Sequence, residues 1–459
     1  MRKYWLPGAI LLMTLAVYLP TLRYGLVYDD LGQLVKNPRL TAWHYVPGYF
    51  TTHVWAHLAG QPANYYRPVF LLWLRLMYVL CGAPGPLWHL PTVLTHLGAT
   101  VAVFALLKHI TEDLRASAVA TAVFAVHPIH TEAVAWVSAV SEPLFTALLI
   151  GCVYFYSRRR GRVSLLSLAL ALAAMLTKEV GIIAPLLIAG YACTRSTWKQ
   201  ALSDAAPYLL PVVVVEALRW NAMGTLGTTM PVMMSQWQMA LTWPSVLALD
   251  ARHILWPVHL SESYPVEIGT SVLPLILLAV LMAAAMVAFW KASANVRFAI
   301  LWIVFTLAPT LALRSLFYGD FVHDRYLYLP SVGLALLLAI ALRHIQWRPA
   351  YNIGVLLVLA ALIVGTEREL PVWRSNLSLF TRAVETSPSN PYLLNSLGQA
   401  YMEEHQVAEA QPLLERAIAI NPIYWKPYYN LALCYQEQGQ PVEARAMYER
   451  AMQVRQQTQ

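Results

Sequence analysis

Residues 163–194 read VSLLSLALALAAMLTKEVGIIAPLLIAGYACT, which is two apolar runs separated only by Lys178 and Glu179. A transmembrane helix needs about 20 apolar residues to cross roughly 30 Å of hydrocarbon, so the runs over 163–177 and 180–194 are each short for a crossing. Two short spans that meet at a charged turn are tolerated where the turn is buried in protein or lines a wet cavity. The stretch therefore predicts membrane helices and directs attention to this turn.

The apolar pattern of this stretch recurs over the first 366 residues. Of the 459 residues, 58% are hydrophobic and 12% are charged, against roughly half and a quarter in a soluble domain. The mean hydropathy is +0.51. A single globular core cannot bury that many apolar residues, because cores stop growing past a few hundred residues. A water-soluble enzyme is thereby excluded. Eleven transmembrane helices are expected, over residues 5–22, 88–107, 116–127, 139–156, 163–177, 180–194, 206–219, 271–290, 297–313, 328–342 and 350–366.

Basic residues set the expected orientation, because cytoplasmic loops carry an excess of Lys and Arg. With the N-terminus in the cytoplasm, every inside loop holds at least two of them: Arg2 and Lys3, Lys108 and Arg115, Arg158 to Arg160 with Arg162, Arg195 and Lys199, Lys291 and Arg297, Arg343 and Arg348. The outside segment 128–138 holds none. The apolar segment 68–81 is short and interrupted by Arg75, and we expect it to lie along the membrane surface.

Charge and cysteine usage exclude several other classes of protein. The formal net charge is +8, but the basic residues stand in small groups between apolar runs rather than on one face, so no nucleic-acid partner is expected. The four cysteines show no C-x-x-C spacing, which indicates neither a zinc site nor a disulfide framework. The apolar run after Arg2 and Lys3 lacks a small-residue cleavage site before Arg23, so we expect an uncleaved first span.

After Thr366 the composition turns polar, and a repeat with a period of 34 residues appears. Leu397, Gly398, Tyr401, Ala410, Leu414 and Ala417 recur as Leu431, Ala432, Tyr435, Ala444, Tyr448 and Ala451, and Phe380, Ala383 and Pro388 stand one period before Leu414, Ala417 and Pro422. This period is typical of tetratricopeptide repeats, so we expect about two and a half such units over 367–459. Span parity places them outside the membrane, on the side of loop 23–87. Such repeats are scaffolds as often as they are substrate readers.

Two adjacent acids, Asp29 and Asp30, follow the first expected span within YGLVYDDLGQLVKNP, residues 24–38. For an isolated pair the plainer interpretation is a solvated interfacial pair, because carboxylates are common in loops. The functional interpretation is a general base at the boundary between water and lipid, near the head group of a lipid-borne substrate.

Other ionisable residues stand at the ends of expected spans on the same side: His127, His130, Glu132, Glu142, Lys178, Glu179, His323, Asp324 and Arg325. Ionisable groups at membrane depth are costly and usually mark a pathway or a site. Plainer interpretations are interfacial caps for His127 and His130, pairing of Lys178 and Glu179 with each other or with a neighbour, and an interfacial anchor for Arg325. No third ligand has convincing zinc spacing, which disfavours a zinc site at the two histidines. Their gathering on one leaflet indicates a site.

Several motifs together resemble one family. They are TLRYGLVYDDLGQLVKNP at 21–38, Tyr66-Arg67-Pro68, HLPTVLTH at 89–96, HPIHTEAVAW at 127–136, LTKE at 176–179 and RYLYLP at 325–330, followed by the repeats. In this order they resemble the transmembrane and tetratricopeptide-repeat glycosyltransferases of the GT-C superfamily, relatives of the protein O-mannosyltransferases. The family usually has an Arg two residues before the acid that corresponds to Glu142, whereas this chain has Val140.

The resemblance implies an all-α GT-C-type transmembrane domain over 1–366, a repeat domain over 367–459, and a site for sugar transfer. The implied donor is a polyprenyl-phosphate sugar and the implied acceptor is a protein Ser or Thr hydroxyl. One carboxylate then takes the hydroxyl proton in an inverting transfer, with Asp29 as the first candidate and Asp30 as the second. Cations should meet the charge that develops on the lipid phosphate. The candidates for substrate binding are Arg325, Lys178, Arg67, Glu179, His127 and His323.

No cofactor and no metal are assigned, although a divalent cation bridging Asp29 or Asp30 to the phosphate stays open. We expect Asp29, Lys178 and Arg325 to line one cavity that opens to the outer leaflet of a bacterial inner membrane. Two other functions stay open: sugar transfer to a lipid or polysaccharide, including whole oligosaccharides from a lipid diphosphate, and a non-catalytic membrane scaffold that presents the repeats to partners.

Overall fold

The computed structural model describes residues 5–58, 65–159, 163–226, 234–313, 321–346 and 349–458, and these residues form helices and loops without a strand. The predicted all-α class is confirmed. The chain divides into two compact units. The first unit holds Met1–Leu260 and Val266–Leu370, and the second holds Ser261–Pro265 and Pro371–Gln459.

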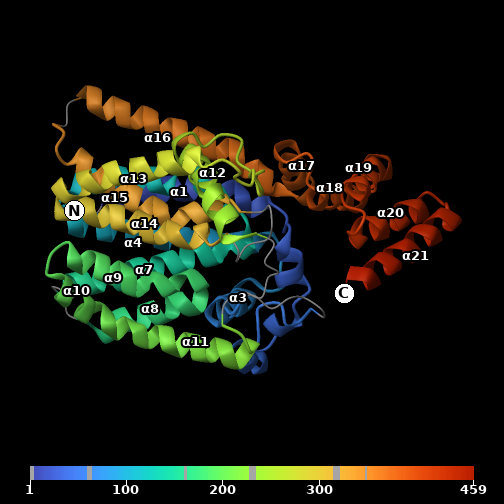
Figure 1. Cartoon of the computed structure of the whole chain (residues 1–459), viewed down its shortest axis with the longest axis horizontal. Coiled ribbons are helices and arrows are strands. Elements are labelled where there is room, and N and C mark those ends of the chain that lie inside the picture. The colour runs from blue at the N-terminus through green and yellow to red at the C-terminus, as the bar shows by residue number, and fades with distance from the viewer. Residues whose placement is uncertain are drawn as a thin grey trace. The chain divides into compact units, whose positions relative to one another are not determined.

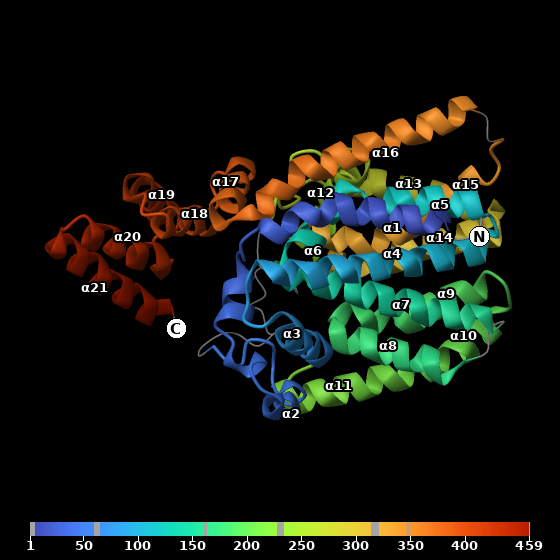
Figure 2. The ribbon, with the colours of Figure 1, turned by 180° about the vertical axis from the view of Figure 1, so that it is seen from behind.

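The first unit is a bundle of long helices that run side by side (Figures 1 and 2). Its α-helices are α1 (Trp5–Tyr18), α2 (Val46–Tyr49), α3 (Pro68–Cys81), α4 (His89–Thr111), α5 (Leu114–Ala125), α6 (Thr131–Ala135), α7 (Ser141–Arg158), α8 (Leu165–Thr177), α9 (Ala184–Cys193), α10 (Trp198–Ala205), α11 (Leu209–Met223), α12 (Gln236–Leu255), α13 (Leu273–Lys291), α14 (Ala294–Leu307), α15 (Tyr328–Leu342) and α16 (Pro349–Glu369). The short helices that matter for the site are η2 (Leu31–Val35), η6 (Pro128–His130), η7 (Val137–Val140), η8 (Glu179–Ile183) and η12 (Asp324–Leu327).

The bundle contains enough apolar helices for a multi-pass membrane protein, as predicted. Seven described helices are long and apolar enough to cross a membrane: Trp5–Arg23, Pro86–Thr111, Val137–Arg158, Trp198–Met223, Leu273–Lys291, Ala294–Leu311 and Asp324–Leu342. The pair Leu114–Ala125 and Pro128–Ala135, bent by 53°, makes an eighth if it is one span. Leu165–Thr177 and Glu179–Cys193 are shorter apolar helices. The count of eleven stays a prediction.

The two ends of the bundle carry different connections. In Figures 1 and 2 the N-terminus, α10 and the start of α16 lie at one end, and α3 lies toward the other. The predicted parity likewise groups the N-terminus with the loops after 194 and 342, and places loop 23–87 on the opposite side. Which end faces the cytoplasm stays a prediction, and of its basic residues Arg2, Lys3, Arg160, Arg162 and Arg348 lie outside the described ranges.

Helix α13 has no buried residue along its 19 positions. Leu281, Val280 and Val287 are each at least 60% exposed. A contiguous apolar surface of this size is not stable against water, so it requires lipid or a partner helix. This helix is therefore the plainest membrane-facing surface of the bundle.

The two short apolar runs of residues 163–194 are separated by a sharp break, as predicted. Helix α8 ends because Lys178 is extended, with φ −154° and ψ 140°, and η8 then folds back on it. At Gly181 an added Cβ atom would lie 2.6 Å from the Met175 nitrogen and 2.7 Å from the Ala174 carbonyl carbon. These are backbone atoms that cannot rotate away, so the turn requires glycine at this position.

We expect Gly181→Ala to destabilise the bundle by about 1–3 kcal/mol, because the extra methyl group overpacks the turn. Thermal unfolding of the purified protein in detergent measures this change. Gly98→Ala in α4 is the matched control, because an added Cβ there meets no atom within 4 Å. Equal melting temperatures for the two variants would show that the close approach at Gly181 is not a constraint.

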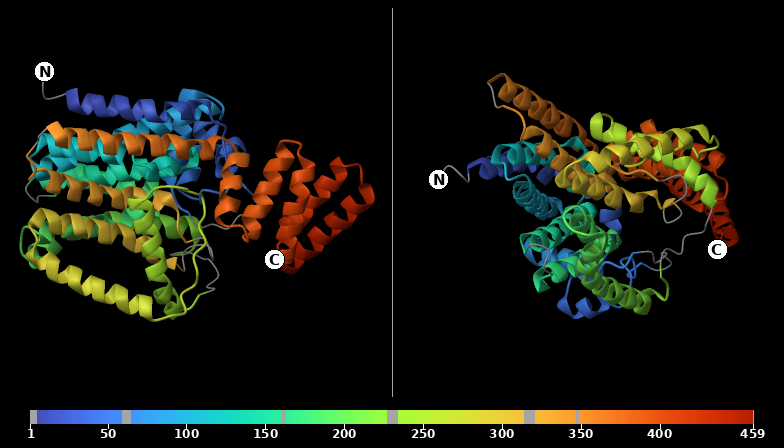
Figure 3. Two further views of the ribbon diagram at one scale, coloured as in Figure 1. Left: turned by 90° about the horizontal axis from the view of Figure 1, so that it is seen from above. Right: turned by 60° about the vertical axis from the view of Figure 1, so that its left-hand side comes forward.

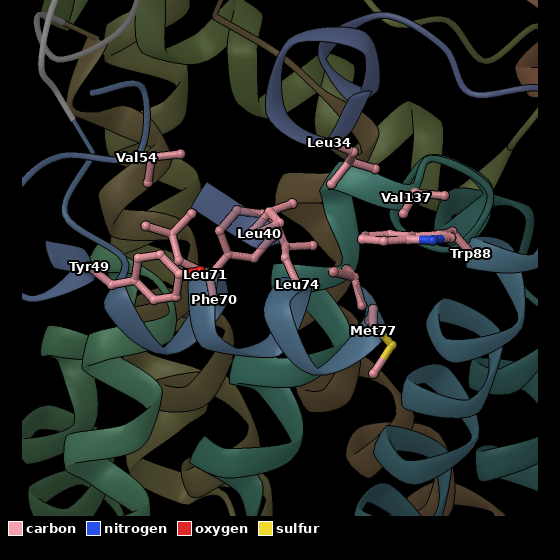
Figure 4. Packing of buried hydrophobic residues seen from close by; sticks show 11 residues of the cluster. Leu34, Leu40, Tyr49, Val54, Phe70, Leu71, Leu74, Met77, Trp88 and Val137 are labelled. Carbon is pink, nitrogen blue, oxygen red and sulfur yellow. The ribbon is translucent and has the colours of Figure 1, made fainter. Parts of the chain in front are cut away.

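The segment between α1 and α4 has its own apolar core (Figure 4). Its buried residues are Leu34, Leu40, Tyr49, Val54, Phe70, Leu71, Leu74, Met77, Trp88, Val137 and Val140. Helix α3 contributes one face to this core, while Leu76, Val79 and Leu80 on its other face are exposed. Arg75 is buried and lies over the Trp43 ring, 4.7 Å from its centroid. An apolar outer face is what an interfacial helix presents to lipid, so its placement on the membrane surface stays the prediction.

The second unit repeats one helical pair along the chain. Its helices are α17 (Asn376–Thr386), α18 (Pro391–Glu403), α19 (Val407–Ile420), α20 (Trp425–Glu437) and α21 (Pro441–Thr458), and Figure 3 shows them stacked in red. Helices α18 and α20 begin 34 residues apart, and so do α19 and α21. Ala410, Leu414, Leu431 and Cys434 form the core between these pairs. The predicted period and repeat type are confirmed.

Candidate functional site

A cavity of about 490 Å³ lies in the first unit, within the size range of small-molecule sites. Five of the predicted catalytic and substrate-binding residues line it: Asp29, Arg67, Lys178, Glu179 and Arg325. The charged lining is completed by Glu142 and Arg219, and the aromatic lining includes Trp55, Tyr65, Trp136 and Tyr326. The structure thus brings Asp29, Lys178 and Arg325 into one cavity, while the chemical role of each stays a prediction.

Asp29 stands at the start of η2 on a tight turn. The preceding residue, Tyr28, has a φ of 55°, a left-handed conformation that is uncommon outside glycine and is often found at functional sites. The Tyr28 ring packs against Trp136, with centroids 5.4 Å apart. The Asp29 side chain is half-buried, and no described residue forms an ion pair or hydrogen bond with it. The turn therefore presents an unpaired carboxyl group to the cavity.

The environment of Asp29 suits a group that accepts a proton near neutral pH. Burial raises the pKa of Asp29 to about 6, and the positive charges of Arg325 and Arg67 oppose this rise. A general base is most effective when its pKa lies close to the working pH. Asp29 is ionised at neutral pH and still basic enough to take a proton.

Asp30 is fully buried and holds the same turn together. Its Oδ2 accepts from the Val27 nitrogen at 3.1 Å, and its Oδ1 accepts from the nitrogen and the hydroxyl of Ser138 at 2.7 and 2.6 Å. Burial raises the pKa of Asp30 to about 7, while the hydrogen bonds from Ser138 and Val27 lower it. Asp30 does not line the cavity. Its contacts tie the turn to η7 and thereby position its neighbour.

Three ion pairs surround the cavity, and each joins a cation to a glutamate from a distant part of the chain. They are Arg67 with Glu179, Lys178 with Glu142, and Arg325 with Glu132. Glu179 also accepts from the Tyr66 nitrogen at 3.1 Å, and Glu132 from the Arg325 nitrogen at 2.8 Å. Lys178 and Glu179 therefore pair with neighbouring groups and not with each other, which is one of the two plainer interpretations of this turn.

Aromatic rings lie close to two of these cations. The Arg325 guanidinium lies 5.2 Å from the Trp136 ring centroid and 5.0 Å from that of Tyr326. The Lys178 ammonium lies 5.4 Å from the Tyr326 centroid. Such cation–π contacts fix the position of a charge without neutralising it. Arg325 and Lys178 are thereby held at the wall of the cavity.

His127 and His323 do not line this cavity. His127 caps η6, because its Nδ1 accepts from the Ile129 nitrogen at 3.2 Å, and its Nε2 lies 3.1 Å from the Ile254 oxygen. His323 is 3% exposed and packs edge-on against Tyr326, with centroids 5.0 Å apart. His323 therefore reaches the site through Tyr326. The substrate-binding roles of His127 and His323 stay predictions, and neither residue is part of the cavity lining.

Arg219 is a charged residue of the cavity that the sequence reasoning missed. It lies on α11, is 7% exposed, and also lines a smaller cavity of about 150 Å³ together with Glu179 and Tyr66. The available signal was its position at the end of the apolar run 206–219, because an ionisable residue at membrane depth is expensive. It adds a fourth cation to the lining.

Val140, where the family pattern suggests Arg, is buried in the apolar core of Figure 4. Its neighbours Ala139 and Ser141 line the cavity. The positive charge of this site comes from other helices instead. Within the described ranges, no group of three or more His, Cys, Asp or Glu side chains is placed to hold a metal ion.

The fold and the cavity define a class: a multi-pass helical membrane protein with an unpaired carboxyl group among fixed cations and a tetratricopeptide-repeat unit at its C-terminal side. Residues 401–459 match the family model for the tetratricopeptide repeat. The chain is 24% identical to the Protein O-mannosyl-transferase F38B6.6 of Caenorhabditis elegans over 92% of its length and 64% of that protein. It is 25% identical to the Protein O-mannosyl-transferase TMTC3 of Homo sapiens over 89% of its length and 50% of that protein.

The chain thus spans between half and two thirds of the length of these relatives. Among solved structures, ArnT from Cupriavidus metallidurans bound to undecaprenyl phosphate is 16% identical, with a TM-score of 0.44, over 96% of this chain and 79% of ArnT. The predicted resemblance to the protein O-mannosyl-transferases is confirmed.

Proposed function

We propose that the chain is an inverting glycosyltransferase of the GT-C type, which moves mannose or another hexose from a polyprenyl-phosphate carrier to a Ser or Thr hydroxyl of a protein. The observation that carries this proposal is the unpaired Asp29 carboxyl group, which shares one cavity with Arg67, Lys178 and Arg325. A base beside several cations is the arrangement needed to activate a hydroxyl while a phosphate leaves. The similarity to protein O-mannosyl-transferases supports the choice of acceptor.

In the proposed reaction, Asp29 takes the proton of the acceptor hydroxyl. The hydroxyl oxygen forms a bond to the anomeric carbon from the face opposite the phosphate, and the bond between that carbon and the phosphate oxygen breaks. The electron pair leaves with the lipid phosphate, so the configuration at the anomeric carbon inverts. Asp30 positions Asp29 through Ser138 and does not exchange the proton.

The leaving phosphate gains charge as the bond breaks, so fixed cations lower the barrier. Arg325 and Lys178 are held in place by aromatic rings and by buried glutamates. Because the two cations are already positioned, they do not have to reorient as the phosphate leaves. Arg67 and Arg219 supply further positive charge to the lining. The proposal assigns no resident metal to this step.

The repeat unit is proposed to present the protein acceptor. We place both the cavity and the repeats on the extracytoplasmic side of a bacterial inner membrane, with the N-terminus in the cytoplasm. The charge bias of the loops supports this orientation. A carrier lipid reaches the cavity from the membrane and the acceptor reaches it from water.

Reconstitution tests the proposal. The purified chain in liposomes, supplied with a polyprenyl-phosphate hexose and a Ser/Thr peptide, should yield a glycopeptide that mass spectrometry detects. Nuclear magnetic resonance of that product should show the anomeric configuration opposite to the donor's. Transfer with retained configuration, or transfer to a lipid in place of the peptide, would contradict the proposal.

The transfer rate should depend on pH through Asp29. The base works only when ionised, so below a pKa of about 6 the rate should fall about tenfold per pH unit, and above it the rate should level off. Arg67 lowers this pKa, so Arg67→Gln should move the acidic limb to higher pH. Initial rates between about pH 4.5 and 8 measure both effects. An acidic limb that Arg67→Gln leaves in place would assign the titration to another group.

A further inference from the structure

The repeat unit carries a groove that is separate from the cavity of the bundle. Its volume is about 750 Å³, and its lining comes from two helices only, α18 and α20. The lining residues are Gln399, Met402, Glu403, Tyr429, Asn430, Leu433, Gln436 and Glu437. The groove thus combines apolar and amide side chains with two acids, and no basic residue is among them.

The two acids occupy equivalent positions of successive repeats. Glu403 and Glu437 are one period of 34 residues apart, and each is the last residue of its helix. Both side chains are exposed and both already bind neighbours: Glu403 accepts from Asn376 and Gln399 at 3.0 and 3.1 Å, and Glu437 lies 2.9 Å from His405. These contacts hold both carboxylates in place in the lining of the groove.

The middle of the groove is suited to a polypeptide backbone. Asn430 donates from its amide to Asn395 at 2.9 Å, which links α20 to α18 and fixes the amide group at the groove. Leu433 is 39% exposed between the amides, which leaves apolar surface for a side chain. Amide groups pair with backbone N–H and C=O groups of any sequence. Specificity must then come from the charges at the edge.

We propose that this groove binds the protein acceptor as an extended segment with positively charged residues, held by Glu403 and Glu437. The inference rests on the proposed transfer to a protein and adds the chemistry of the acceptor. Charge complementarity selects this occupant, because the lining carries two acids and no base. The chain as a whole has a net charge of +8 and would favour acidic peptides, so a preference of this groove for basic peptides would run against the overall charge.

The spacing of the two acids sets the spacing of the basic residues. Helices α18 and α20 pack against each other, and packed helices lie about 8–10 Å apart. An extended chain rises about 3.3 Å per residue. Basic residues at intervals of about three therefore match both carboxylates. The Ser or Thr that accepts the sugar can lie between these basic residues or on either side of them in the same peptide segment.

Binding of labelled peptides to the full chain in neutral detergent, without any sugar donor, tests the proposal. The probe is Lys-Thr-Ala repeated four times, and its counterpart is Glu-Thr-Ala repeated four times. Fluorescence anisotropy at low salt should show at least about tenfold tighter binding of the lysine peptide, and the difference should shrink at high salt because exposed charges are screened. Equal affinity of the two peptides, or tighter binding of the acidic one, would overturn the proposal.

Variants locate the binding on the groove. Removing both charges with Glu403→Gln and Glu437→Gln should weaken the lysine peptide at least about fivefold, and changing both to Lys should reverse the preference. The matched control is Glu415→Gln with Glu449→Gln, two exposed acids of the same unit outside the groove, which should bind as the unchanged chain does. An equal loss in the control pair, or no loss in the groove pair, would place the peptide elsewhere.

The outcome separates this inference from the proposed reaction. Asp29→Asn should keep the peptide preference, because the bundle cavity takes no part in groove binding. Peptide preference without sugar transfer would reject the reaction and keep the groove. Transfer to the lysine and glutamate peptides with equal affinity would keep the reaction and reject the groove.

Discussion

Asp29→Asn should abolish sugar transfer, with a loss of about 10²–10⁴-fold in rate, because an amide cannot take the acceptor proton. The change is nearly isosteric, and no described residue donates a hydrogen bond to the carboxyl group, so the fold should persist. Transfer to a Ser/Thr peptide in liposomes, followed by mass spectrometry, measures the effect. Unchanged melting temperature of the variant would assign the loss to chemistry.

A surface acid provides the control for this substitution. Glu112 follows α4 and is exposed, so Glu112→Gln removes one negative charge without touching the cavity. It should transfer sugar at the rate of the unchanged chain. A scaffold without catalysis would show no difference between Asp29→Asn and Glu112→Gln in any assay, and activity retained in Asp29→Asn would remove the base from the mechanism.

Arg325→Gln should be the most destabilising change at the site. It leaves Glu132, which is 1% exposed, without its cationic partner, and an uncompensated buried charge costs about 3–5 kcal/mol. Thermal unfolding in detergent should therefore show a clear drop in melting temperature. Arg325→Lys should lose less stability than Arg325→Gln, because it keeps the positive charge, although it loses the guanidinium contacts with Trp136 and Tyr326.

The double variant Arg325→Gln with Glu132→Gln separates folding from catalysis. Removing both charges restores a neutral pair, so the melting temperature should recover most of its loss. Sugar transfer should stay low, because the phosphate still lacks its cation. Recovery of both properties together would make Arg325 a structural residue, and recovery of neither would show that the two side chains do not act as a pair.

The fold could be predicted from the sequence where its causes are local. Hydropathy runs predicted the membrane helices, and the 34-residue period predicted the stacked pairs, because each depends on residues close together in the chain. The number of spans could not be fixed in the same way. Residues 163–177 and 180–194 form short helices that meet at a sharp break, and length alone does not decide whether each of them crosses the membrane.

The sequence predicted which residues belong to the site better than it predicted which residues they contact. Asp29, Lys178 and Arg325 stood out because charged groups near apolar runs are rare, and the structure brings them into one cavity. Their partners were not predictable. Glu132 meets Arg325 across 193 positions of sequence, and no local pattern indicates such a pairing. Arg219 was missed because it stands at the end of the apolar run 206–219 and belongs to none of the motifs that singled out the other residues.

Lys178 and Glu179 are consecutive, yet one reaches Glu142 of α7 and the other reaches Arg67 before α3. Two consecutive residues therefore connect helix α7 of the bundle with the segment that precedes α3. A negatively charged head group that pairs with Arg67 in place of Glu179 would leave the Glu179 carboxylate without its cation, one residue from Lys178. Binding of a ligand at Arg67 is therefore expected to change the charge beside Lys178.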